Sequence, residues 1–184
     1  VSNALEATDA LTLTVNGATA TAIALNELDA KTSVDVKVDA KEVTGEFTDL
    51  NKLYVTNADK FAALGNENVT ITDTVAATDA NKIANATTGK VTATVTAADA
   101  VTLVGALGAA AATDALTLTV SNTVNVAAAS DLILLDGKTS VDVIVNATTV
   151  TGTFAELNKV YVANKANFAA LGNEAVTISD SVSA

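Results

Sequence analysis

The sequence predicts an α/β protein of repeated strand–helix units, with parallel strands in a solenoid-like stack. The first observation is a duplication: residues 31–75 and 138–182 are two versions of one segment, at a constant offset. The second is that segments with the alternating apolar and polar residues of a strand are followed by segments with the apolar spacing of a helix, repeatedly along the chain. Strands that alternate with helices pair in parallel through crossover connections. Closure into a barrel and a row of tandem β-rich surface domains are the alternatives.

The duplication also sets the expected domain organisation. The sequence LTLTV occurs at 11–15 and again at 116–120, each time after the lead-in ATDA. The repeat units that we expect are 1–113, with a long half (11–67) and a short half (68–113), and 114–184, which is incomplete. On this division the chain opens in the middle of a unit, so Val1 would begin a processed chain or a fragment.

Strands are expected wherever Val, Leu, Ile and Thr alternate between glycine or asparagine turn signals. These segments are Leu11–Val15, Val34–Asp39, Val69–Val75, Lys90–Thr96, Leu116–Val120, Val141–Val145 and Val176–Val182. Two kinds of strand alternate along the chain. One has sequences such as LTLTV or VTITD, and the other has sequences such as VDVKV or VTATV. Two kinds of strand favour a stack of units with two different sides.

Helices are expected between these strands, where apolar residues recur at steps of three and four. The helical segments are Ala20–Asp29, Phe47–Phe61 (as one helix or two short ones), Thr78–Thr88, Ala98–Ala111, Ser130–Asp136 and Phe154–Leu171. Gly65 follows Leu64 as the expected C-terminal cap of the second of them, because glycine accepts the left-handed conformation.

Composition excludes several kinds of function. The chain has no Cys, His, Met, Trp or Pro, and its formal net charge is −11. Without Cys and His there are no disulfides, no thiolate metal site and none of the usual bases for a nucleophilic serine. The negative charge opposes binding to nucleic acid and to anionic membranes. We therefore expect that the chain is not an enzyme and has no cofactor.

The aromatic residues lie in the two long helical segments and are paired by the repeat. They are Phe47, Tyr54, Phe61, Phe154, Tyr161 and Phe168. We expect them to fill the bulky part of an otherwise aliphatic core, with the tyrosine hydroxyls reaching the surface. Stacking against a carbohydrate is the alternative, so a glycan partner stays open.

Rows of hydroxyl side chains are the most suggestive surface feature. The residues expected on the exposed strand face are Thr12, Thr14, Thr70, Thr72, Thr117, Thr119, Thr177 and Ser179. Such a face is most simply a solvated strand surface, since threonine suits strand geometry. A regular array of Thr-x-Thr on a flat sheet could instead bind ice, a mineral or a glycan.

Aspartates are also paired by the repeat, Asp35 with Asp142 and Asp73 with Asp180. Paired carboxylates could bind Ca²⁺. The sequence has neither a D-x-D-x-D-G loop nor a glycine-rich calcium nonapeptide. We therefore expect these aspartates to be solvated charges that protect exposed strand faces from promiscuous pairing, and no metal ligands are assigned.

No membrane insertion is expected. The longest weakly polar run, Ala100–Ala112, is too short to cross a bilayer.

The segment VTITDTVAATDANKIANATTGKVTATV and the paired LGNExVTI segments resemble the Ala/Thr/Val/Asp-rich tandem arrays of giant bacterial, notably cyanobacterial, cell-surface proteins. The resemblance implies export and a place in a surface layer, an adhesin or an extracellular fibre. We therefore expect a structural repeat protein of an extracellular filament or surface layer. Its expected partners are copies of itself, joined head-to-tail or laterally.

Overall fold

A computed structural model describes residues 6–121 and 125–181 of the chain. The backbone divides into two compact units. The first contains Val1–Thr74 and Lys82–Ala93, and the second contains Val75–Asn81 and Thr94–Ala184. Helix α3 (Ala77–Ala86) and strand β7 (Val91–Val95) each cross this boundary. The first unit therefore holds nearly all of copy one of the duplicated segment, residues 31–75, and the second holds copy two, residues 138–182.

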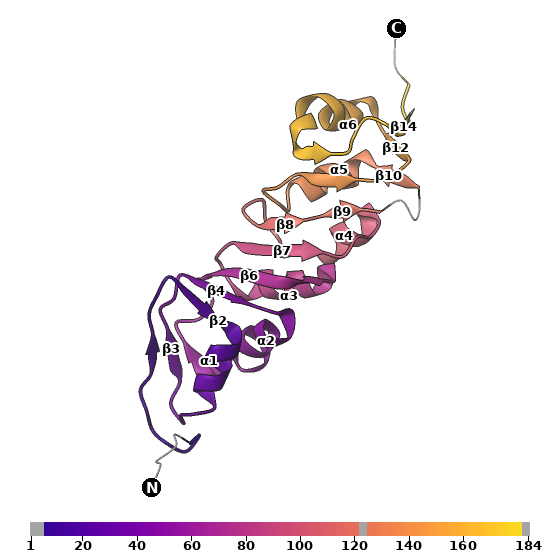
Figure 1. Cartoon of the computed structure of the whole chain (residues 1–184). Helices are drawn as coiled ribbons and strands as arrows, with labels where there is room; N and C mark the ends of the chain where they lie inside the picture. Colours follow the sequence, from indigo (N-terminus) through magenta and orange to yellow (C-terminus); the bar gives the residue numbers. More distant parts are fainter. Residues whose placement is uncertain (1–5, 122–124, 182–184) are drawn as a thin grey trace. The chain divides into compact units, whose positions relative to one another are not determined.

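The first unit repeats a strand, a second strand and a helix (Figure 1). Its elements before α3 are β1 (Thr14–Val15), β2 (Thr19–Thr21), α1 (Ala22–Asp29), β3 (Val36–Val38), β4 (Glu42–Gly45), α2 (Phe47–Asn51), the π-helix η1 (Lys52–Thr56), the 3₁₀-helix η2 (Ala58–Lys60), β5 (Phe61–Ala62) and β6 (Asn68–Val75).

These strands form parallel sheets. One has the order β1-β3-β5, and the other runs β2-β4-β6-β7 through this unit. Their strands pair in parallel, with Glu42 opposite Thr19 on one side and opposite Asn68 on the other. The prediction of an α/β protein with parallel strands is confirmed.

The second unit has the same plan. Its elements are α4 (Ala100–Ala106), β8 (Ala115–Thr117), β9 (Thr119–Val120), β10 (Val126–Ala128), α5 (Ala129–Asp136), β11 (Val143–Val145), β12 (Thr149–Gly152), α6 (Phe154–Asn158), the π-helix η3 (Lys159–Ala163), the 3₁₀-helix η4 (Lys165–Asn167), β13 (Phe168–Ala169) and β14 (Ala175–Ile178). The sheet orders are β9-β11-β13 and β10-β12-β14. Thr149 pairs with Ala175 as Glu42 pairs with Asn68, so the repeat in sequence is a repeat in register.

Each unit is held by an aliphatic core between its sheets and helices. In the first unit the fully buried large side chains include Leu25, Leu50, Leu53 and Ile83. In the second they include Leu103, Leu116, Leu118, Leu132 and Leu135. The prediction of an aliphatic core is confirmed.

The helical segments expected over 47–61 and 154–171 are helical over most of their length, but they are not continuous α-helices. Each is a single α-turn followed by a π-helix, a 3₁₀-turn and a two-residue strand. Gly65 therefore does not cap a helix. It adopts a φ of 106° in the turn that leads from β5 into β6, where glycine carries no steric penalty.

Other boundaries are shorter than expected, and six strands have no counterpart in the expected list. The helix expected over 98–111 covers only α4, and LTLTV at 116–120 divides between β8 and β9. The additional strands β2, β4, β5, β10, β12 and β13 have four residues or fewer. Segments this short carry little periodicity. Val182, at the end of the last expected strand, lies outside the described residues.

Candidate functional site

A tyrosine–glutamate pair organises the end of each copy. In copy one the π-helix η1 presents Tyr54, and the turn before β6 presents Glu67. The Tyr54 hydroxyl donates to Glu67 Oε2 at 3.1 Å, and the backbone N–H of Gly65 donates to the same oxygen at 2.9 Å. Both side chains are buried, with Glu67 only 1% exposed. Burial, followed by the charge of Glu67, raises the pKa of Tyr54 well above its usual range.

Copy two contains the same pair. The Tyr161 hydroxyl donates to Glu174 Oε1, and Glu174 also accepts backbone N–H groups of Gly172 and Asn173 at 2.9 and 3.0 Å. Burial, then the hydrogen bond to Glu174, raises the pKa of Tyr161. Partial burial disfavours the charge on Glu174, but these hydrogen bonds outweigh it and lower the pKa of its carboxyl group. Both pairs thus fix a turn that contains a left-handed glycine.

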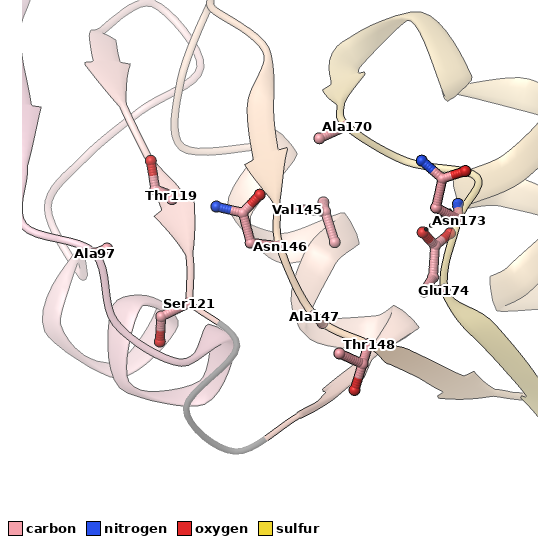
Figure 2. A pocket seen from close by; sticks show the side chains of 10 residues that line it. All are labelled: Ala97, Thr119, Ser121, Val145, Asn146, Ala147, Thr148, Ala170, Asn173 and Glu174. Carbon is pink, nitrogen blue, oxygen red and sulfur yellow. Dashed lines mark hydrogen bonds between the residues drawn. The ribbon is translucent and has the colours of Figure 1, made fainter.

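Glu174 also lines a pocket of about 630 Å³ in the second unit. Figure 2 shows Glu174 and Asn173 on one side, Thr119 and Ser121 on the other, and Asn146 between them. The carboxylate is held ionised by donors from its own turn, so it is a weak base.

The two copies differ in whether a further segment of the chain covers them. In copy one, residues Lys82–Ala93, here called the covering segment, lie over the outer face of the repeat. The N–H of Val69 donates to the carbonyl of Lys90 at 2.9 Å, and the N–H of Lys90 donates to Asn68 Oδ1 at 2.9 Å. These bonds hold the start of β7 against β6.

The covering segment is fixed at its turn as well. The hydroxyl of Thr87 donates to the carbonyl of Glu67 at 2.7 Å, and the N–H of Thr88 donates to the carbonyl of Gly65 at 2.9 Å. The backbones come so close here that a Cβ added at Gly89 would lie 2.1 Å from the Glu67 carbonyl oxygen. Only glycine fits this approach.

The helical part of the covering segment supplies the apolar contact. Ile83 of α3 is fully buried, and Lys82 Nζ lies 5.4 Å from the centre of the Phe47 ring. An ammonium group at this distance is attracted by the face of an aromatic ring.

Copy two leaves the equivalent face open to solvent. Val69 and Ile71 of β6 are 0% and 4% exposed, whereas their counterparts Val176 and Ile178 of β14 are 48% and 45% exposed. Phe154 is 56% exposed. A shallow apolar groove of about 230 Å³ runs over this surface. The residues that line the groove, here called the open face, are Phe154, Leu157, Asn158, Tyr161, Val162, Val176 and Ile178.

The expectation that the aromatics fill the core is therefore only partly correct. Phe61 and Phe168 are buried. The hydroxyl of Tyr54 does not reach the surface but binds a buried carboxylate, and Phe154 lies on the open face. Sequence reasoning missed the open face because copies one and two have the same apolar pattern there, and the pattern does not show what covers it.

The structure distributes the predicted hydroxyl array over several strands. Thr12 lies beside β1, Thr14 on β1, Thr70 and Thr72 on β6, Thr117 on β8, Thr119 on β9, Thr177 on β14 and Ser179 just after it. The register brings a different set together in the first unit, because Thr44 lies opposite both Thr21 and Thr70. Two of these hydroxyls already have partners: Thr70 donates to Glu42 at 2.8 Å, and Thr21 accepts from the N–H of Ala24 at 3.3 Å. Binding of ice, a mineral or a glycan stays a prediction.

One of the two aspartate pairs has a structural contact. Asp73 accepts the N–H of Phe47 at 2.8 Å, and Asp180 accepts the N–H of Phe154 at 2.8 Å. Each carboxylate thus satisfies a free donor in the first turn of α2 or α6. Asp35 and Asp142 are exposed. Within residues 6–121 and 125–181, no three His, Cys, Asp or Glu side chains are grouped so that they could hold a metal ion.

No helix in the described part of the chain is long and apolar enough to cross a membrane. Comparison of the chain with protein-family models, curated protein sequences and solved structures found no match.

Proposed function

We propose that this chain is a structural repeat protein, exported by a bacterium and built into an extracellular filament or surface layer. In this role it is a link in a solenoid-like array of similar strand–helix units. Its partners are other such units, copies of this chain among them. Its role is to connect one unit mechanically to the next, and it catalyses no reaction.

One observation carries the proposal, namely that copy two leaves open a face that copy one has covered. Among the described residues, β14 is the last strand in the order β10-β12-β14, and no strand pairs with its outer edge. An exposed strand edge beside exposed apolar side chains is a template for another chain segment. Because the covering segment differs from the face that it covers, such a contact is heterologous, and heterologous contacts build open filaments when the rotation between units does not close a ring.

Charge and composition support this role. A net charge of −11 keeps a protein soluble at high local concentration, which suits a secreted building block. The resemblance of the sequence to arrays of bacterial surface proteins points to the same location.

Immunogold electron microscopy of the source cells, with antibody raised against the purified chain, tests the proposal. We expect label on fibres or on a regular layer outside the cell, and negative-stain images of purified protein should show regular assemblies as concentration rises. Label confined to the cell interior, or isolated particles at every concentration, would contradict it.

A further inference from the structure

We propose that Asn146 is a glycosylation site, whose side-chain amide receives a sugar from a glycosyl diphosphate after the chain has folded. Residues 146–148 read Asn-Ala-Thr, the acceptor motif for sugars linked to asparagine, which marks a surface loop in an exported protein. The inference rests on the proposed function, because export brings a chain to the enzymes that transfer such sugars.

The motif alone does not select this residue. The chain contains three Asn-x-Thr motifs, which begin at Asn68, Asn85 and Asn146. In the first, Asn68 Oδ1 accepts the N–H of Lys90 at 2.9 Å, and the hydroxyl of Thr70 donates to a carboxylate at 2.8 Å. In the second, Asn85 is exposed, but Thr87 is buried and its hydroxyl donates to a backbone carbonyl at 2.7 Å. A transferase must contact both the amide and the hydroxyl, so the folded chain withholds these two motifs.

The third motif forms the turn between β11 and β12. Asn146 and Thr148 are exposed, whereas Ala147 between them is buried and anchors the turn. Within residues 6–121 and 125–181, the side-chain amide of Asn146 has no hydrogen-bond partner. The hydroxyl of Thr148 donates at the surface to the carbonyl of Asn125 at 2.9 Å, and such a bond exchanges for one to water or to an enzyme at little cost. This turn therefore offers both groups that a transferase contacts.

Exposure of this turn does not depend on an edge of the sheet. The N–H of Asn146 donates to the carbonyl of Val120 at 3.0 Å, and the carbonyl of Thr148 accepts the N–H of Ala175 at 2.8 Å. Segments of the chain thus lie on both sides of the turn, and Asn146 is exposed with both of them in place.

The pocket of about 630 Å³ gives the attached sugar a place to bind. Figure 2 shows Asn146 between Thr119 on one side and Asn173 and Glu174 on the other. Hydroxyl, amide and carboxylate side chains supply the donors and acceptors that sugar hydroxyls require. The volume lies within the usual range for sites of small ligands, so the first sugar residue can lie against these walls.

The transfer forms one bond and breaks one. Nδ2 of Asn146 bonds to the anomeric carbon of the donor, and the bond from that carbon to the diphosphate oxygen breaks. The diphosphate leaves with the electron pair, and the amide loses one proton to a base of the transferase. This chain supplies the acceptor nitrogen and the walls around the product, and the transferase supplies the catalytic groups.

Copy one has the same turn without an acceptor. At the repeat offset Asn146 corresponds to Asp39 and Thr148 to Lys41, in the turn between β3 and β4. Both residues are exposed, and Asp39 is paired with Lys37 at 2.7 Å. The molecule therefore contains a matched turn on which the acceptor motif can be built.

Peptide mapping by mass spectrometry, on the protein purified from its source cells, tests the site. We expect a sugar on the peptide that contains Asn146 and none on the peptides with Asn68 and Asn85. The variant Asn146→Gln, expressed in the same cells, should lose the added mass. An unmodified Asn146 would overturn the proposal. Equal modification of all three asparagines would overturn it as well, because it would mean transfer to the unfolded chain.

The added mass also identifies the source of the glycosyl diphosphate. A single sugar indicates a nucleotide-linked donor, and a preassembled oligosaccharide indicates a lipid-linked donor. Both results support the site, since each places the first sugar on Nδ2 of Asn146.

A gain of modification in copy one is the complementary test. The double variant Asp39→Asn, Lys41→Thr creates the motif in the matched turn, and we expect a second sugar at residue 39. Asp39→Asn alone is the control, because it loses the same exposed ion pair without completing the motif, and it should gain no sugar. A double variant modified only at Asn146 would contradict the view that an exposed turn makes the acceptor.

The two proposals fail separately. Immunogold label inside the cell, together with a sugar on Asn146, would remove the extracellular role and keep the site. Fibres on the cell surface with an unmodified Asn146 would do the reverse.

Discussion

The two copies of the duplicated segment form a comparison within one molecule. Both contain a π-helix, a tyrosine bonded to a glutamate, a left-handed glycine and a carboxylate on the first turn of the helix. They differ in exposure, because only copy one lies under the covering segment. Local sequence is therefore sufficient for the turn geometry, whereas burial of the face depends on a segment outside the repeat.

The largest expected effect is that of Gly89→Ala, which would make copy one resemble copy two. A Cβ at this position meets backbone atoms of Glu67 and Asn68 at 2.1 to 2.7 Å. Backbone cannot move aside as a side chain can, so we expect a loss of about 3 kcal/mol or more in the free energy of unfolding. Urea unfolding measures the loss, and tyrosine fluorescence should show Tyr54 becoming exposed.

Gly105→Ala is the control for this substitution. Gly105 lies within α4, and a Cβ there meets nothing within 4 Å. Alanine in a helix is favoured over glycine by roughly 0.5–1 kcal/mol, so this variant should be slightly more stable. Equal destabilisation by both substitutions would show that the close approach at Gly89 is not the cause.

The second prediction compares the same side chain in the two copies. Ile71→Ala removes a buried side chain and should cost about 3 kcal/mol, in the usual range for isoleucine to alanine in a core. Ile178→Ala removes one that is 45% exposed, and should cost about 1 kcal/mol. Thermal unfolding of the two variants measures both losses of stability. Equal losses of stability in the two variants would mean that Ile178 is buried in solution.

The third prediction concerns the tyrosine hydroxyls. Tyr54→Phe removes the hydroxyl donor and leaves the buried Glu67 with the backbone N–H of Gly65, and should cost about 2 kcal/mol. Tyr161→Phe should cost about half as much, because Glu174 keeps two backbone donors and has access to water. Chemical unfolding of each variant gives the values, and a larger loss at Tyr161 would contradict this account of the pair.

The smallest expected effect is a loss of stability in acid that is caused by Glu174 of copy two. The pKa of Glu174 is lower in the folded chain than its ordinary value. Its carboxylate therefore stabilises the fold above that ordinary value, and this contribution is lost as pH falls through the folded pKa. Glu174→Gln should be less stable than the parent at neutral pH, and the two should converge in acid. Parallel stability curves, measured by unfolding at a series of pH values, would argue against it.

Much of the fold could be predicted from the sequence. Alternating Val and Thr marked β6 and β7, helical spacing marked α1, and terminating glycines marked α3 and α5. The alternation of strands with helices indicated parallel sheets, as found. The strands that were missed have two to four residues, too few for a period of two to emerge. The π-helix was missed because Leu50, Tyr54 and Phe61 keep nearly helical spacing while the backbone widens and then extends.

The candidate site could not be predicted in the same way. Val69 and Val176 occur in matching sequence, so no local pattern separates a buried residue from an exposed one. The difference comes from Gly89 and Val91, about twenty residues along the chain from the face that they cover. The pairing of β7 with β6 depends on the register of the parallel sheet, and the sequence alone does not give that register.

The parallel registers also have a consequence for the way the chain folds. Thr19 pairs with Glu42 and Glu42 with Asn68, at separations of 23 and 26 residues, and copy two repeats these intervals. Each strand thus pairs with its neighbour across a single crossover connection that contains a helix, and these pairings need no contact between the two ends of the chain. Within each unit, pairing can therefore follow the order of the chain. A chain released from its N-terminal end can become ordered progressively, one strand interval at a time.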